Sequence, residues 1–245
     1  MLDPVERLIV ALDVANADSA FALARRLRGR VGALKVGLEL ANAAGVGILD
    51  RLRDEAGVRV FYDCKLHDIP NTVAGATRAI AAHGVWMMNV HASGGARMVR
   101  AAAEALADAQ VAAGARPLLV AVTLLTSIAP EELARELRVP LDPTAYVRDL
   151  AFLAREAGAD GVVASPHEVP TIREGCGPDF VVVTPGVRPA GADRGDQRRV
   201  ATPGDAVRAG ATYLVVGRPI TAAPDPAAAA EAVVAEIAEA MAGGG

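Results

Sequence analysis

This sequence has few cysteines, no excess of positive charge and no long apolar runs. Only Cys64 and Cys176 are cysteines among 245 residues, too few for a disulfide framework or a cysteine-based metal site. The formal net charge of −4 gives no basic surface for nucleic acid. No apolar stretch reaches the roughly 18 residues needed to cross a bilayer, and the acidic N-terminal segment does not resemble a secretory signal. We therefore expect a cytoplasmic protein with reduced thiols that binds neither nucleic acid nor membrane.

Aromatic residues are also few, at 3% of the chain, although hydrophobic residues make up 52%. The core must therefore be built largely from Val, Leu, Ile and Ala, which suits a parallel sheet covered by helices. A chain of this length can bury a sizeable core and matches the usual length of α/β barrels.

Short apolar segments alternate with helix-like segments along the whole chain. The predicted strands are Leu8–Leu12, Ala33–Val36, Val58–Tyr62, Val85–Val90, Pro117–Val122, Gly161–Ala164, Phe180–Val183 and Thr212–Val216. Among the helices we expect Ser19–Leu27, with Asp18 as N-cap, and one helical region over Glu39–Glu55. Alternation implies parallel strands and right-handed crossovers, so the predicted fold is α/β, a single (β/α)8 TIM-barrel domain over residues 1–245. A doubly wound open sheet is the alternative, but no GxGxxG motif follows the first strand.

The segment VRVFYDCKLHDIPNTV, from Val58 to Val73, concentrates charge at the end of a buried strand. Side chains alternate along a strand, so Asp63 and Lys65 should share a face while Cys64 points the other way. Asp68 follows just past the strand, before the next helix. Buried charges are costly unless they pair or bind something. The segment is therefore either a functional charge array or a surface ion pair at a strand tip.

Polar residues also end several other predicted strands, and in barrels the active site lies at these carboxyl ends. The strand-end residues are Asp13, Lys35, Asp63 with Lys65, His91, Thr126 with Ser127, and Gly217 with Arg218. Single cases have simpler explanations: His91 could be a core-edge histidine bonded to backbone, and Asp13 could cap a loop. Their convergence on one mouth favours an active site.

The loops after the seventh and eighth predicted strands have features of a phosphate site. Gly186 and Gly217 allow close backbone approach to an anion. Arg188 and Arg218 offer forked donor pairs that match phosphate oxygens. The loop from Pro185 to Thr202 is long for a compact domain and favours a functional lid, with a charged surface loop as the alternative.

Taken in order, the strand-end motifs resemble those of the orotidine 5′-phosphate decarboxylase family, in its shorter bacterial branch. The matching strings are ALDV, KVG, DCKLHDIPNTV, NVHASGG, LLTS, TPGVRP, GADRGDQRRVATP and VVGRPI. Each is weak alone, but their order covers nearly the whole chain. Cys64 stands where many members have leucine.

The resemblance implies a carboxy-lyase that converts orotidine 5′-phosphate to UMP without cofactor or metal. Lys35, Asp63, Lys65 and Asp68 correspond to the family's Lys-Asp-Lys-Asp array. Lys65 would stabilise the carbanion left at C6 when CO₂ departs and then protonate it. In the family the second aspartate reaches the partner's site, so Asp68, Ile69 and Thr72 would act across a homodimer interface.

The resemblance also implies which residues bind the substrate. Those expected at the ribose are Asp13, Lys35, Asp63 and Thr72. Those expected at the pyrimidine are Thr126, Ser127 and Gln197. Those expected around the phosphate are Arg188, Gln197, Gly217 and Arg218, and Pro185 is also counted as substrate-binding.

Two other functions fit parts of the sequence. A Mg²⁺-dependent sugar-phosphate decarboxylase or aldolase on the same barrel shares the Asp-x-Lys-x-x-Asp spacing, but the HDIPNTV continuation and LLTS argue against it. A non-catalytic nucleotide binder would keep Arg218 and lose the Lys/Asp array, which is complete here.

Overall fold

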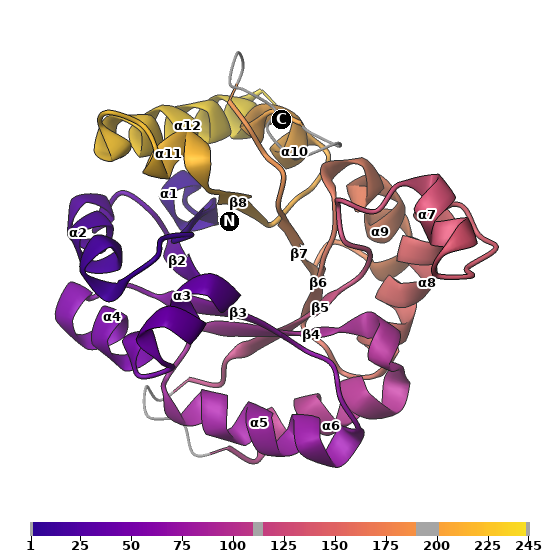
Figure 1. The fold of residues 1–245 in the computed structure, drawn as a ribbon. Coiled ribbons are helices and arrows are strands. Elements are labelled where there is room, and N and C mark those ends of the chain that lie inside the picture. Colours follow the sequence, from indigo (N-terminus) through magenta and orange to yellow (C-terminus); the bar gives the residue numbers. More distant parts are fainter. Residues whose placement is uncertain (1, 110–114, 190–200, 244–245) are drawn as a thin grey trace.

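Eight parallel strands close into a barrel in this computed structural model, which describes residues 2–109, 115–189 and 201–243. The strands are β1 (Leu8–Ala11), β2 (Ala33–Val36), β3 (Val60–Leu66), β4 (Met87–His91), β5 (Leu118–Val122), β6 (Gly161–Val163), β7 (Val181–Thr184) and β8 (Tyr213–Val216). They follow sequence order, and β1 pairs in parallel with both β2 and β8 (Figure 1). This closure confirms the predicted barrel and contradicts the open-sheet alternative.

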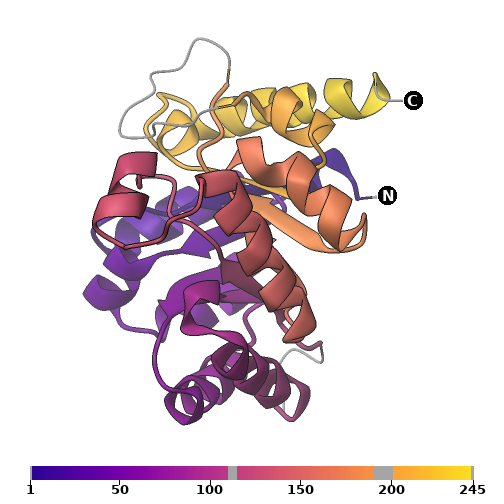
Figure 2. The ribbon, with the colours of Figure 1, turned by 90° about the vertical axis from the view of Figure 1, so that its right-hand side faces the viewer.

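The longer helices surround the barrel, whereas the short α1 lies inside this ring in the view of Figure 1. The helices are α1 (Pro4–Arg7), α2 (Ala17–Leu27), α3 (Leu38–Ala44), α4 (Ile48–Ala56), α5 (Pro70–Ala82), α6 (Ala96–Ala107), α7 (Pro130–Arg135), α8 (Pro143–Glu156), α9 (Val169–Cys176), α10 (Pro203–Arg208), α11 (Arg218–Thr221) and α12 (Pro226–Ala242), with short 3₁₀ turns at Ala92–Gly94 and Pro166–Glu168. Figure 2 shows α1 and the end of α12 on the same side of the barrel. None of the helices in the described ranges has the length and apolar character needed to span a membrane.

The third strand extends further than predicted. The prediction placed it at Val58–Tyr62, whereas β3 begins at Val60 and continues through Leu66. Asp63 and Lys65 are accommodated inside the strand because they pair, with Lys65 Nζ 2.6 Å from Asp63 Oδ1. Both groups are therefore carried by the barrel itself rather than by the loop after it.

Two helix predictions were wrong in detail. Asp18 lies in the first turn of α2, and the N-cap is Asn16, whose side chain accepts the N–H of Ser19 at 2.9 Å. The helical region expected over Glu39–Glu55 is divided into α3 and α4, because Gly45 has φ of +76° and ends the first helix.

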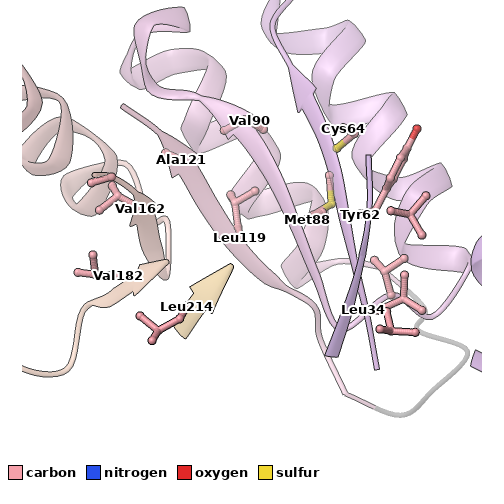
Figure 3. Packing of buried hydrophobic residues seen from close by; sticks show 14 of the residues in the cluster. Leu34, Tyr62, Cys64, Met88, Val90, Leu119, Ala121, Val162, Val182 and Leu214 are labelled. Atoms are coloured by element: carbon pink, nitrogen blue, oxygen red, sulfur yellow. The ribbon is translucent and has the colours of Figure 1, made fainter. Parts of the chain in front are cut away.

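Strand alternation divides the apolar side chains into two cores. The outward-facing residues pack between strands and helices, and Figure 3 shows part of this larger cluster around Leu34, Tyr62, Met88 and Leu119. Cys64 belongs to the same cluster, so it points away from the barrel interior as predicted (Figure 3). Its burial raises the pKa of the thiol to about 11.

The barrel interior is filled by a smaller cluster of inward-facing residues. Its buried members are Ile9, Ala11, Ala33, Phe61, Met87, Val120, Val183, Tyr213 and Val215. Polar and small residues continue these inward rows toward the carboxyl ends: Asp13 after Ala11, Lys35 after Ala33, Asp63 and Lys65 after Phe61, Asn89 after Met87, and Gly217 after Val215. Because every second side chain points inward, the barrel interior has an apolar layer, and a polar layer lies above it at the carboxyl ends of the strands.

Candidate active site

A pocket of about 380 Å³ opens at the carboxyl ends of the strands, a volume suited to a small-molecule ligand. Its walls come from residues of seven strands, all but β7, and from loops that follow the strands, including the loop after β7. The lining residues are Ala11, Asp13, Lys35, Phe61, Asp63, Lys65, Asn89, Val122, Leu124, Leu125, Thr126, Val163, Ala164, Pro185, Gly186, Val187, Arg188, Val215, Gly217 and Arg218. Charged groups from both ends of the sequence therefore face one cavity.

Asp63 lies at the centre of the charged groups. Its Oδ2 is 3.0 Å from Lys35 Nζ and its Oδ1 is 2.6 Å from Lys65 Nζ. The side chains of Asp63 and Lys35 are each 12% exposed and that of Lys65 is 29% exposed. Asp13, at the rim, lies 3.5 Å from Lys35 Nζ. A buried carboxylate thus has an ammonium group on each of its oxygens.

Burial and charge act in opposite directions on the groups of this array. Burial alone would raise the pKa of Asp63, but the charges of Lys35 and Lys65 outweigh it and lower that pKa to about 2. Burial likewise disfavours the charged form of Lys35, yet Asp63 and Asp13 raise its pKa above the ordinary value. Asp63 and Lys35 are therefore both ionised at neutral pH, because each stabilises the charged form of the other.

The local sequence leaves room for the array. An added Cβ at Gly37, two residues after Lys35, would lie 3.2 Å from Lys35 Nζ. A Cβ at Gly217 would lie 3.6 Å from a carboxylate oxygen of Asp13. Glycine at these two strand ends therefore keeps side-chain atoms out of the space beside the charges.

The loops after β7 and β8 carry the predicted phosphate-binding groups. Arg188, after β7, and Arg218, after β8, both line the pocket, as do Pro185 and Gly217. Arg188 is only 9% exposed. Thr126, after β5, lines the same cavity. Two guanidinium groups thus share a pocket with the two ammonium groups of the array.

Four predicted site residues do not line this pocket. Asp68, Ile69, Thr72 and Ser127 are exposed, and Ile69 retains 65% of its accessible surface. Asp68 accepts the N–H of Ile69 at 2.6 Å. Gln197 lies outside the described residues. One chain therefore brings together most of the predicted site and leaves the segment after β3 on the surface.

Asn89 lines the pocket although sequence reasoning did not assign it a role. It is 1% exposed and its Nδ2 donates to Asp63 Oδ1 at 2.7 Å. Strand alternation contained the signal that could have found it, since Asn89 is two residues from Met87 on the inward face of β4.

His91, which ends β4, lies beside the array. Its ring centroid is 5.4 Å from that of His67. Burial, with the charges of His67 and Lys65, lowers the pKa of His91, and Asp63 opposes this shift. Across the described ranges, no three His, Cys, Asp or Glu side chains form a cluster that could hold a metal ion.

A closed (β/α)8 barrel with paired opposite charges and two arginines at its carboxyl mouth defines a class of enzyme that acts on small anionic substrates. Comparisons with known proteins are more specific. A sequence model of the "Orotidine 5'-phosphate decarboxylase / HUMPS family" matches residues 6–233. This chain therefore belongs to that family.

Individual relatives cover almost the whole chain. The chain is 56% identical over 233 residues to a protein of Moorella thermoacetica named orotidine 5′-phosphate decarboxylase, covering 95% of this chain and 92% of that one. It is 56% identical over 234 residues to a protein of the same name from Halorhodospira halophila, covering 96% and 97%. The crystal structure of orotidine 5′-phosphate decarboxylase from Lactobacillus acidophilus is similar with a TM-score of 0.84 and 40% identity, over 94% of this chain and 98% of that one.

The low pKa of Asp63 predicts a pH-dependent contribution to stability. Folding lowers this pKa from 3.8 to about 2, so the ionised form contributes about 2 kcal/mol above pH 4, which is lost as the pH falls toward 2. Asp63→Asn should therefore be destabilised most at neutral pH. The difference in unfolding free energy between wild type and variant, measured in urea, should narrow below about pH 4. A difference in unfolding free energy that stays constant from pH 6 to pH 3 would contradict the lowered pKa of Asp63.

Proposed function

We propose that this chain decarboxylates orotidine 5′-phosphate to UMP and CO₂, the last step of UMP synthesis, with Lys65 as the proton donor. The observation that carries the proposal is the contact of Lys65 Nζ with the buried, ionised carboxylate of Asp63, 2.6 Å away inside the mouth pocket. Membership of the family and the names of the relatives give the substrate.

The chemistry requires stabilisation of an electron pair on carbon. When the bond between C6 and its carboxylate breaks, CO₂ leaves and the pair stays on C6, where no adjacent carbonyl delocalises it well. A fixed ammonium group stabilises this charge electrostatically, and no reorganisation is needed when it forms. Lys65 then transfers one ammonium proton to C6 and is left neutral. Asp63 holds the ammonium group of Lys65 in place. Its negative charge also repels the substrate carboxylate, which destabilises the bound substrate until CO₂ leaves.

The pocket offers complementary groups to the rest of the nucleotide. Arg188 and Arg218 supply guanidinium groups for the phosphate, with Pro185, Gly217 and Gln197 in the same part of the sequence. Asp13 and Lys35 would bind the ribose hydroxyls, and Thr126 with Ser127 would contact the pyrimidine. Binding energy from a phosphate far from C6 can be used to stabilise the transition state.

Charge pairing within the array supports a metal-independent reaction. Asp63 Oδ1 accepts from Lys65 and Asn89, and Oδ2 accepts from Lys35. A divalent cation at this carboxylate would have to displace ammonium groups that carry charge of the same sign. The arrangement therefore favours the decarboxylase over the Mg²⁺-dependent sugar-phosphate enzyme.

We also propose a homodimer in which Asp68, Ile69 and Thr72 complete the partner's site. Support comes from their position directly after β3 and from their exposure, which includes a largely solvent-accessible isoleucine. An exposed apolar side chain beside a carboxylate suits an interface near a charged pocket. A cytoplasmic location is supported by Cys64 and Cys176, which are both free and buried.

Lys65→Ala should abolish turnover without preventing nucleotide binding. Loss of the proton donor is expected to lower kcat at least about 1,000-fold, measured by the absorbance change of the pyrimidine as orotidine 5′-phosphate is consumed. UMP should still bind, as judged by calorimetry. Arg148→Ala, which removes an exposed cation from α8, is the matched control and should leave kcat unchanged. Appreciable activity of Lys65→Ala would remove the proton-donor assignment.

Excess EDTA should leave the activity of the wild-type protein unchanged, because the carboxylate of the array is neutralised by ammonium groups. The assay compares kcat for orotidine 5′-phosphate before and after chelation and after addition of Mg²⁺. Activity that disappears with EDTA and returns with Mg²⁺ would favour the sugar-phosphate enzyme instead.

Mixing two inactive variants should restore activity if the site is shared between subunits. A dimer of one Lys65→Ala chain and one Asp68→Ala chain contains one site with both native residues. Random reassociation of equal amounts should give about a quarter of wild-type activity, whereas each variant alone stays inactive. An inactive mixture, despite hybrid dimers detected by native mass spectrometry, would exclude the shared site.

A further inference from the structure

The strand that carries Asp63 and Lys65 is irregular where these residues lie. Between Tyr62 and Leu66 its pairing with β4 advances by four residues on β3 but by only two on β4. Lys65, within this stretch, has φ of +48°, a left-handed conformation that residues other than glycine seldom adopt. Regular backbone hydrogen bonds between β3 and β4 therefore do not hold Lys65, and its conformation must be stabilised by other contacts.

Asn89 lies on β4 opposite the irregular stretch and bonds to each of its central residues. Its Oδ1 accepts the backbone N–H of Lys65 at 2.7 Å, and its Nδ2 donates to Asp63 Oδ1 at 2.7 Å. Its carbonyl oxygen accepts from Cys64 Sγ at 3.2 Å. One buried amide thus binds both the backbone of the lysine and the carboxylate that holds its ammonium group.

We propose that Asn89 is a positioning residue for Lys65, acting through its two side-chain hydrogen bonds to Lys65 N–H and Asp63 Oδ1. The inference rests on the proposed function, in which Lys65 delivers the proton. Asn89 Nδ2 and Lys65 Nζ donate to the same oxygen of Asp63. The amide therefore fixes that oxygen and the Lys65 backbone together, which sets the place of the ammonium group relative to the reacting carbon.

Two substitutions separate the donor and acceptor functions of the amide. Asn89→Ala removes both. Asn89→Asp keeps an acceptor for the Lys65 N–H but can donate to Asp63 only when it carries a proton. Two adjacent carboxyl groups share a proton more readily as the pH falls. If Asn89 served only to fill space, the activity of Asn89→Asp relative to wild type would not depend on pH, because aspartate has nearly the same shape as asparagine.

Kinetics give the first measurement. Asn89→Ala should lower kcat on the order of 100-fold while KM for orotidine 5′-phosphate changes less than about threefold. Asn89→Asp should regain activity relative to wild type as the pH falls from about 8 to about 5.5. The ratio to wild type is needed at each pH because other ionisable groups surround this position: Asp13, Lys35, Asp63, Lys65, His67 and His91.

Thr123→Val is the matched control. Thr123 is 4% exposed at the end of β5, and its Oγ1 donates to the carbonyl of Val163 at 2.9 Å. The variant loses a buried hydrogen bond of similar length at a neighbouring strand end, outside the pocket lining. Its kcat should stay close to the wild-type value at every pH.

Selective labelling gives a second measurement that does not depend on activity. Lys35 and Lys65 are the only lysines in the sequence, so [¹⁵N]lysine labelling yields two lysine backbone amide signals. In Asn89→Ala the Lys65 amide should shift and exchange at least about tenfold faster with solvent. In Asn89→Asp it should stay protected, because an acceptor remains. The Lys35 amide is the internal reference and should change in neither variant.

The outcomes separate this inference from the proposed function. Wild-type protein that fails to turn over orotidine 5′-phosphate contradicts the function, whereas the amide signals still test the contacts of Asn89. An active wild type with Asn89→Ala within threefold of its kcat overturns the inference. Equal losses of kcat in both variants that do not depend on pH also overturn the inference. Failure of both variants to fold in the presence of UMP overturns it as well, since Asn89 would then serve only to stabilise the fold.

Discussion

The site depends on one interaction, the ionised carboxylate of Asp63 held between the ammonium groups of Lys35 and Lys65. Each charge would be costly to bury alone, and removing one partner of a buried pair leaves the others uncompensated. At 3.0 and 2.6 Å the two contacts are close enough to lower the pKa of Asp63 to about 2 despite its burial. Charges held in place by such contacts meet the condition under which the proposed electrostatic stabilisation of a carbanion is most effective.

The barrel supplies this arrangement through two simple constraints. Alternation along each strand sends every second side chain inward, and closure from β8 to β1 brings the ends of the sequence together. Lower positions of the inward rows are apolar, as at Ile9, Phe61 and Met87, so the interior is packed below the charges. The array can therefore sit at the mouth without disturbing the core, and Arg218 from the end of the chain faces the same pocket as Asp13 from its beginning.

Much of this could be predicted from periodicity alone, and the exceptions have physical causes. Eight apolar segments alternating with helices predicted the barrel, and the period of two predicted that Asp63 and Lys65 share a face. The pattern of polar residues at strand ends did not include Asn89, because this residue lies within β4. The left-handed backbone of Lys65 has no local signal in the sequence, since it occurs where the pairing of β3 with β4 is irregular. The roles proposed for Asp68, Ile69 and Thr72 would require a second chain, so they stay predictions.

Both lysines of this chain belong to the charged array, which agrees with the chemistry proposed for the site. Salt bridges on the outside use arginine, as between Arg26 and Asp225 and between Arg30 and Glu231, while both lysines of the sequence lie in the array. A guanidinium group serves well in a fixed ion pair but does not give up a proton in proteins, whereas an ammonium group can. A left-handed lysine costs about 1–2 kcal/mol, and it persists only where its surroundings over-determine it. Hydrogen bonds from Lys65 to Asp63 and Asn89 provide these surroundings. The strained backbone of Lys65 and the buried charge beside it are thus two consequences of placing an ammonium group on a barrel strand.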